Sequence, residues 1–253
     1  MSEGYTPLIV IPARMASSRL PGKPLADIDG KPMIVQVMNR ALEADLGPVV
    51  IACAEVEIAN VVNDAGGTAI LTDASHPSGS DRVFEAVETF DPEQKFQSII
   101  NLQGDLPGLD PVAILAANEA LQKNNADIAT LVAEITDQAE LNDENAVKAV
   151  VSMRAGEKFG RALWFSRLKT PWGEGAYFHH IGIYAYKRAS LKKFISLDPS
   201  PLELREKLEQ LRALEAGMRI DAACVDTVPL GVDTPQDLER MRQYFVSRSE
   251  SPE

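Results

Sequence analysis

Cysteine and histidine are scarce in this chain, and their spacing excludes several common kinds of site. The 253 residues include two cysteines, Cys53 and Cys224, and three histidines, His76, His179 and His180. These residues do not form the closely spaced sets that bind zinc or carry out thiol redox chemistry. We therefore expect both thiols to be reduced residues that pack within the fold.

Long apolar segments are missing as well. No stretch of the sequence approaches the roughly 18 uninterrupted apolar residues that a membrane-spanning helix needs. Residues 1–6 also lack the basic region followed by an apolar region that begins a secretory signal. The sequence thus predicts a cytoplasmic protein with no membrane insertion.

Positive charge is in short supply. The chain has 25 Lys and Arg residues against 37 Asp and Glu residues, which gives a formal net charge of −12. Nucleic acids and anionic membranes are polyanions that such a chain repels at long range, so we expect neither as a partner. An anionic small ligand would need a local cluster of cations.

At this length folding removes roughly 70 to 75% of the unfolded surface from water, enough for one large domain with or without a smaller appendage.

Short apolar runs alternate with longer amphipathic runs in the first half of the chain. This alternation is typical of repeated βαβ units and of a mostly parallel sheet. The predicted strands cover residues 8–12, 48–53, 68–71 and 97–102. The predicted helices cover residues 32–45, 55–65, 81–90 and 111–123. We therefore expect an α/β fold.

The second half of the chain has a different pattern. Runs rich in β-branched and aromatic residues are separated by Gly and Pro turns, which predicts strands over residues 127–134, 146–153, 162–165 and 178–186. These strands either extend the sheet with antiparallel pairing or form a small second lobe. Amphipathic patterns predict two helices, over residues 201–216 and 235–245.

A basic loop directly follows the first predicted strand. Residues 8–26 contain Arg14, Arg19 and Lys23 and no acidic residue. Open α/β sheets bind ligands at the carboxyl ends of their strands, where three cations would neutralise a polyphosphate. The loop is not a Walker A motif, because Pro24 follows Lys23, and it lacks the G-x-G-x-x-G pattern of dinucleotide-binding proteins. A solvated surface loop with scattered charges is the alternative interpretation.

Two carboxylates follow later predicted strands. Asp105 lies on a Gly-Asp turn, where a carboxylate suits a hard cation such as Mg²⁺; the alternative is that it caps the turn or the next helix. Thr234, Pro235 and Asp237 form a variant of the capping box, which leaves the neighbouring Asp233 without a local role. Asp233 is therefore a candidate for a second carboxylate on the metal.

These features together resemble a known enzyme family. Six segments in order, at residues 11–14, 79–82, 101–105, 180–184, 208–212 and 231–235, resemble the 3-deoxy-manno-octulosonate cytidylyltransferase (CMP-Kdo synthetase) family over nearly the whole chain. The resemblance implies a Rossmann-like, mostly parallel, doubly wound sheet of the nucleotide-diphospho-sugar transferase type with a smaller mixed or antiparallel extension. It also implies one nucleotidyltransferase domain over residues 1–253, in which strands at about 127–190 form a small lobe for sugar binding or dimerisation.

The resemblance also implies roles for individual residues. The residues that would contact CTP are Pro12, Ala13, Arg14, Arg19, Lys23, Arg82 and Gln103. Asp105 and Asp233 would coordinate Mg²⁺, and with Lys23 and Arg14 they would form the catalytic set. The residues that would bind the sugar are Arg167, His180, Tyr184, Glu209 and Gln210, with Arg167 a candidate for the sugar carboxylate. Without the resemblance, His180 and Tyr184 would be interpreted as buried packing residues, and Arg82, Arg167 and Glu209 as surface charges. His76 and His179 receive no role.

The family's reaction defines the expected function and its alternatives. The anomeric hydroxyl of 3-deoxy-D-manno-octulosonate (Kdo) would attack the α-phosphorus of CTP, giving CMP-Kdo and pyrophosphate for lipopolysaccharide synthesis, and family members are commonly homodimers. The alternatives are activation of sialic acid or an amino-substituted Kdo, and a nucleotide-sugar-binding protein of the same fold without turnover. The chain departs from the family pattern near the sugar side in three places. They are Leu106, the Thr-Pro-Trp sequence at residues 170–172 and the short segment 172–179.

Overall fold

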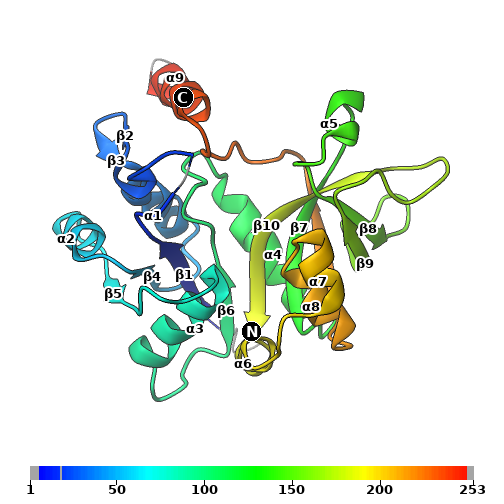
Figure 1. Ribbon diagram of the computed structural model, residues 1–253, viewed down its shortest axis with the longest axis horizontal. Helices are drawn as coiled ribbons and strands as arrows, with labels where there is room; N and C mark the ends of the chain where they lie inside the picture. Colours follow the sequence, from blue (N-terminus) through cyan, green and yellow to red (C-terminus); the bar gives the residue numbers. More distant parts are fainter. Residues whose placement is uncertain (1–5, 18, 250–253) are drawn as a thin grey trace. The chain divides into compact units, whose positions relative to one another are not determined.

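The computed structural model describes residues 6–17 and 19–249, which form two compact units (Figure 1). The first unit comprises Met1–Ile114 and Pro229–Glu253, and the second comprises Leu115–Val228. Residues 1–5, on which the expectation of no secretory signal partly rests, lie outside the described residues.

The first unit is built on four parallel strands. They are β1 (Leu8–Ala13), β4 (Val49–Cys53), β5 (Ala69–Leu71) and β6 (Ser98–Asn101). Their order is β5-β4-β1-β6, and every pair is parallel. β4 and β6 are buried along their whole length, as expected for continuous apolar runs in a parallel sheet. The four strands predicted from the first half of the chain are confirmed.

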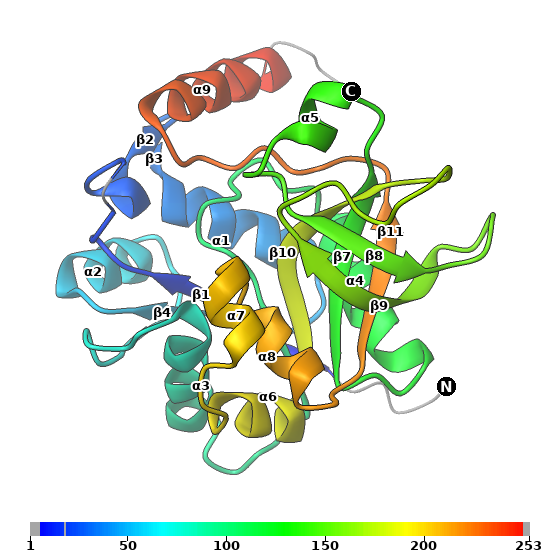
Figure 2. The ribbon, with the colours of Figure 1, turned by 45° about the vertical axis from the view of Figure 1, so that its right-hand side comes forward.

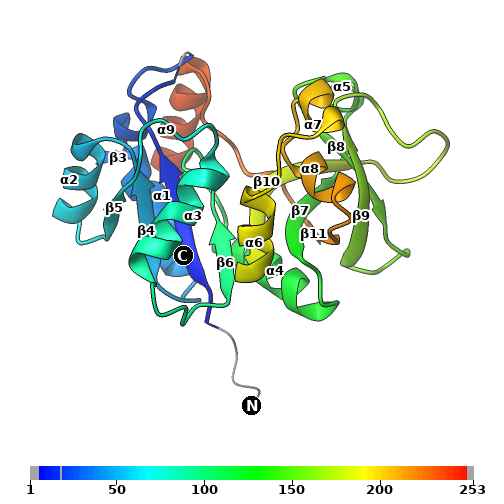
Figure 3. The ribbon, with the colours of Figure 1, turned by 60° about the horizontal axis from the view of Figure 1, so that its bottom comes forward.

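Helices connect and cover these strands. They are α1 (Met33–Glu43), α2 (Val56–Asp64), α3 (Gly79–Phe90) and the C-terminal α9 (Pro235–Ser249), and α4 (Pro111–Lys123) contains the boundary between the two units. Helices α1 and α2 contact each other, whereas α3 contacts β1, β4 and β5 and lies in front of β1 in Figure 3. The Ser78 hydroxyl accepts from the Asp81 N–H, which explains why α3 begins before the predicted residue 81.

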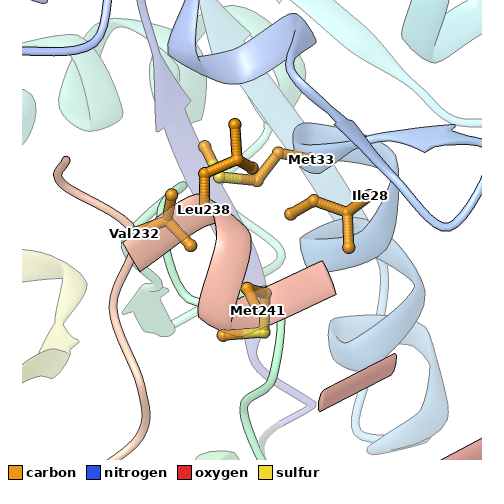
Figure 4. Close-up of a cluster of buried hydrophobic side chains, with 5 residues drawn as sticks. All are labelled: Ile28, Met33, Val232, Leu238 and Met241. Atoms are coloured by element: carbon orange, nitrogen blue, oxygen red, sulfur yellow. The ribbon is translucent and has the colours of Figure 1, made fainter. Parts of the chain in front are cut away.

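A small apolar cluster fixes α9 beside the basic loop (Figure 4). Ile28, Met33, Val232, Leu238 and Met241 are buried together, with Leu20 and Ala26 packed against them. Ile28 belongs to a two-stranded hairpin of β2 (Asp27–Ile28) and β3 (Lys31–Pro32) that the sequence did not predict. The cluster contains residues next to the basic loop after β1 and residues next to the start of α9. It therefore holds the loop and the segment before α9 close to each other.

Five strands of the second unit close into a ring. They are β7 (Ile128–Glu134), β8 (Lys148–Ser152), β9 (Phe159–Ser166), β10 (Phe178–Lys187) and β11 (Ile220–Val225), grouped together in Figure 2. β10 pairs with both β7 and β8, β7 with β11, β11 with β9 and β9 with β8; only the β7–β11 pair is parallel. The predicted α/β class is confirmed, and the sheet is mixed; the sequence predicted neither the ring nor β11. The ring closes at β10, where Phe178 and His179 pair with both β7 and β8.

The helix predicted over residues 201–216 is wrong as a single helix. The structure has α7 (Pro201–Glu206) and α8 (Gln210–Glu215), and between them Lys207 adopts a left-handed conformation with φ of 57°. A left-handed residue ends the run of helical hydrogen bonds. The second unit also contains α5 (Gln138–Asn142) and α6 (Arg188–Ile195). In the described part of the chain, no helix is both long and apolar enough to cross a membrane.

Candidate active site

A cavity of about 370 Å³ opens in the first unit at the carboxyl ends of β1 and β6. Sequence-based candidates contribute a large part of its lining: Pro12, Ala13, Arg14, Arg19, Lys23, Arg82, Gln103 and Asp105. The three cations of the basic loop thus gather at one end of the sheet, where open α/β folds bind ligands. In a chain of net charge −12, this arrangement favours a polyanionic ligand.

Lys23 lies between the two carboxylates that were candidates for a metal site. Its Nζ donates to Asp105 Oδ2 at 2.8 Å and to Asp233 Oδ1 at 3.0 Å. Burial alone would lower the pKa of Lys23, but Asp105 and then Asp233 more than offset this effect, so the pKa is raised and the ammonium stays charged. Arg19 also donates from Nη2 to Asp233 Oδ2 at 2.9 Å. The site therefore already holds a cation between Asp105 and Asp233.

Backbone contacts explain why the two carboxylates meet. The Val232 N–H donates to the Asp105 carbonyl oxygen at 3.0 Å, which ties the Gly-Asp turn to the segment before α9. A Cβ on Gly104 would lie 2.7 Å from the carbonyl oxygen of Pro12, so only glycine lets this turn approach the end of β1. Asp237 accepts from the N–H groups of Asp233 and Thr234, which confirms the capping arrangement and orients Asp233.

Arg82 is a buried cation of this cavity and not a surface charge. Its exposed fraction is 2%, and its Nη1 donates to the Thr72 hydroxyl. The start of α3 contributes Ser78 and Gly79 to the lining, so a helix N-terminus adds its positive end to the site. His76, which the sequence analysis set aside, also lines the cavity and pairs with Glu85. His76 follows β5, a parallel strand that ends at the same edge of the sheet as β1. This position in the sequence could have marked His76 as a candidate for the site.

The donor set fits a hard divalent cation. Two carboxylates from separate turns face one point, and Mg²⁺ is commonly held by one or two carboxylates together with substrate phosphates. Within the described residues, no group of three or more His, Cys, Asp or Glu side chains is placed to hold a metal ion. A metal at Asp105 and Asp233 would thus depend on further oxygens from a ligand.

The sugar-side candidates lie in the second unit. The ring centroids of His180 and Tyr184, both on β10, are 5.6 Å apart. The pKa of Tyr184 is raised well above its usual value, mainly by burial and then by the neighbouring Tyr186 and Glu209. Gln210 is 6% exposed, and its buried Nε2 has no hydrogen-bond partner among the residues that the structure describes. A buried amide donor without a partner is costly unless a ligand completes it.

Arg167 is held beside the same segment. Its Nε donates to the Glu206 carbonyl oxygen at 3.0 Å, and its Nη1 donates to the Glu144 carbonyl oxygen at 3.0 Å. Since these acceptors are neutral, the guanidinium charge is not cancelled by a carboxylate in either bond. The structure therefore brings Arg167 to the turn that precedes Glu209 and Gln210.

A buried ion pair fixes the turn between α7 and α8. Arg212 donates to both carboxylate oxygens of Glu203, at 2.7 and 2.5 Å, and the two side chains are only 10 and 11% exposed. Glu203 is also the third residue of a complete capping box with Ser200. The pair joins the two helices across Lys207, where the predicted long helix is interrupted.

Replacing Glu203 by Gln should lower the free energy of unfolding by about 3 kcal/mol, because the buried Arg212 guanidinium loses the charge of the carboxylate that accepts two of its hydrogen bonds, while the Glu209 carboxylate is 3.9 Å away. Urea unfolding measures this loss. Glu93→Gln is the matched control, since Glu93 pairs with Lys95 at the surface with both side chains about 70% exposed and should change stability little. Equal effects of the two substitutions would show that the buried pair has no special weight.

Known proteins resemble this chain over nearly its whole length. The profile of the cytidylyltransferase family matches residues 8–220. The 3-deoxy-manno-octulosonate cytidylyltransferase of Paramagnetospirillum magneticum is 60% identical over 94% of this chain and 96% of its own length. The protein of the same name from Rhodospirillum centenum is 61% identical over 96% of this chain and 95% of its own length.

A solved structure extends the similarity to three dimensions. The structure of CMP:2-keto-3-deoxy-manno-octonic acid synthetase complexed with CTP matches 96% of this chain and 99% of its own with a TM-score of 0.88 and 38% sequence identity. The chain belongs to the cytidylyltransferase family, and within it to the 3-deoxy-manno-octulosonate cytidylyltransferases.

Proposed function

We propose that the protein transfers the cytidylyl group of CTP to Kdo, forming CMP-Kdo and pyrophosphate for lipopolysaccharide synthesis. Relatives that carry the name of this activity are about 60% identical to it over nearly their whole length. The observation that supports the chemistry most directly is Lys23, which lies between Asp105 and Asp233 and lines a cavity rich in cations. This arrangement suits a reaction in which a triphosphate must be held and its charge neutralised.

The basic loop and the start of α3 bind the nucleotide in this proposal. Arg14, Arg19 and Lys23 neutralise the triphosphate and stabilise the pyrophosphate as it leaves, while Arg82 and Gln103 contact CTP. Pro12 and Ala13 form the adjoining wall of the cavity. Phosphoryl-type transfer needs the attacking and leaving oxygens in line and the charge on the phosphate oxygens balanced, so positioning and electrostatics carry most of the catalysis.

Asp105 and Asp233 would hold Mg²⁺ in the working enzyme. The bound ion would polarise the α-phosphate and lower the pKa of the attacking sugar hydroxyl. The two carboxylates supply the negative charge for this site, and Lys23 neutralises them in the free protein. With a divalent cation at these carboxylates, the Lys23 ammonium would be available to phosphate oxygens.

The second unit binds the sugar acid. Arg167 pairs with the sugar carboxylate, because its guanidinium is bonded to carbonyl oxygens and keeps its charge. His180, Tyr184, Glu209 and Gln210 bind hydroxyl groups, and the buried Nε2 of Gln210 gains the acceptor that it lacks in the free protein. The chain thus combines a cationic nucleotide site with a hydrogen-bonding sugar site.

Other features of the family complete the proposal. The parallel strands and helices of the first unit form a doubly wound, Rossmann-like sheet, and the two units act as one nucleotidyltransferase domain, with the strands at about 127–190 as the sugar-binding or dimerisation lobe. The enzyme works as a homodimer in the cytoplasm, where CTP is available. Size-exclusion chromatography with light scattering measures the oligomeric state.

A substrate matrix tests the function. Pyrophosphate release is measured with Mg²⁺ for each of the four common nucleoside triphosphates against Kdo, sialic acid and an amino-substituted Kdo. We expect rapid release with CTP and Kdo alone, and loss of release when EDTA removes the metal. Preference for another sugar acid would move the assignment to that sugar, and no release with any pair would indicate a nucleotide-sugar-binding protein without turnover.

A further inference from the structure

Thr130 lies where β10 departs from regular pairing with β7. Ile181 of β10 pairs with Leu131, yet the next residue of β7, Thr130, pairs with Tyr184, so residues 182 and 183 bulge out of the strand. The bulge stands between His180 and Tyr184, the two β10 side chains of the proposed sugar site. Any group that fixes the bulge also fixes these two side chains relative to each other.

The Thr130 hydroxyl has three polar neighbours inside the bulge. Its side chain is fully buried, and Oγ1 lies 3.1 Å from the carbonyl oxygen of Ile181 and 3.0 Å from that of Ile183. The third neighbour is Nε2 of His180, also at 3.0 Å. Among the described residues, this hydroxyl is the only hydrogen-bond partner of the His180 ring.

Counting protons determines which nitrogen of His180 carries hydrogen. A hydroxyl has one proton, and both carbonyl oxygens can only accept, so the Thr130 proton goes to one of them. If Nε2 were the acceptor instead, the hydroxyl oxygen would face two carbonyl oxygens at about 3 Å with no hydrogen between them. Nε2 must therefore carry a proton and donate it to Oγ1. The bulge imposes the Nε2–H form of the ring.

The other ring nitrogen is then a bare acceptor. Burial, followed by the neighbouring His179, lowers the pKa of His180 to about 3, so the ring carries a single proton at neutral pH. The His180 ring also packs against the Phe165 ring in a T-shaped arrangement, with 4.8 Å between ring centroids, which restricts rotation of the imidazole. With its proton on Nε2, the ring offers the Nδ1 lone pair to a donor from outside the chain.

We propose that Thr130 is a positioning residue that fixes His180 in the Nε2–H tautomer, so that Nδ1 accepts a hydrogen bond from a hydroxyl of the sugar acid. This inference rests on the proposed function, because it takes His180 as part of the sugar site. It makes Thr130 a determinant of sugar recognition although the hydroxyl itself is enclosed by protein. A sugar acid that lacks the matching hydroxyl cannot form this hydrogen bond to Nδ1 and binds less well.

Nitrogen NMR tests the tautomer without reference to activity. Two-bond ¹H–¹⁵N correlation spectra of ¹⁵N-histidine protein distinguish the two tautomers, and loss of signals in His180→Asn identifies the His180 ring. We expect the Nε2–H form in the wild type and in Thr130→Ser, and a mixture containing the Nδ1–H form in Thr130→Val, which keeps the side-chain shape. The Nδ1–H form in the wild type, or an unchanged spectrum in Thr130→Val, would overturn the proposal.

Kinetics test the link to the sugar. Thr130→Val should raise the KM for Kdo about tenfold and leave the KM for CTP within about twofold, because only the hydrogen bond to the sugar is weakened. Thr130→Ser should restore the wild-type value. A rise in both KM values, or no rescue by Ser, would indicate a merely structural role and contradict the proposal.

A second pair of variants covers the case in which Thr130→Val does not fold. In place of His180, the side-chain amide of Asn would occupy the position of Nδ1, whereas the amide of the longer Gln would occupy the position of Nε2. Because Nδ1 is the atom proposed to contact the sugar, His180→Asn should retain more Kdo affinity than His180→Gln. The reverse order would overturn the proposal. Wild-type protein that releases no pyrophosphate from CTP and Kdo would refute the proposed function instead, and the NMR result would still decide the tautomer.

Discussion

Asp105→Asn should lower the rate of pyrophosphate release at saturating CTP and Kdo by roughly 100-fold or more. An amide keeps the size of the side chain but removes the negative charge that Asp105 supplies for a divalent cation. The fold should be retained, because the Asp105 side chain is 29% exposed and its ion pair with Lys23 is partly solvated. Steady-state kinetics and thermal unfolding measure the two effects.

Asp64→Asn is the matched control for this substitution. Asp64 is an exposed residue at the end of α2 in the same unit, so the same chemical change there should leave turnover unchanged. Adding Mg²⁺ well above the wild-type requirement should recover part of the activity of Asp105→Asn, since the remaining carboxylate of Asp233 still attracts the ion. Turnover like that of the wild type in Asp105→Asn would remove Asp105 from the metal site.

Lys23→Ala is expected to reduce kcat by roughly 100-fold while the KM for Kdo changes little. Lys23 is 16% exposed and lies within 3.0 Å of both carboxylates, so its charge acts in a partly buried part of the cavity lining. Its raised pKa keeps it protonated through the neutral range, and the ammonium can therefore neutralise phosphate oxygens. Measuring kcat and both KM values separates the two substrates.

Lys31→Ala provides the comparison for Lys23. Lys31 is an exposed cation on β3, outside the lining of the cavity, and its loss should leave kcat unaffected. Lys23→Arg should recover only a part of the activity, because a planar guanidinium cannot replace an ammonium between two carboxylates without rearrangement. An effect of Lys23→Ala confined to the KM for Kdo would mean that the basic loop binds the sugar and not the triphosphate.

Local patterns predicted the elements of the first unit well. The continuous apolar runs became buried parallel strands, and the cations of the basic loop line a cavity at the end of β1. These features depend on residues close together in the sequence, where hydrophobic periodicity and turn chemistry act directly. The same reasoning placed Asp105 at the end of β6 and left Asp233 without a local role.

Long-range packing accounts for what the sequence patterns missed. The segment 201–216 has a helical pattern throughout, yet it is interrupted at Lys207, where the Glu203–Arg212 pair joins α7 to α8. Arg82 would be interpreted as a surface cation from its local sequence, but α3 packs on β1 and β4 and buries it. In both places contacts with distant parts of the fold outweigh local propensity.

Motifs and local patterns were enough to identify the family, the α/β class, the run of cations after the first strand and the carboxylates that follow later strands. The folded structure was needed to show that Lys23 lies between Asp105 and Asp233, which are 82 and 210 positions away in the chain. It alone also decided that five strands close into a ring and that a bulge in β10 sets the proton of His180. Such relations are distances between residues far apart in the sequence, and they are set by the packing of the whole core, which no local pattern encodes.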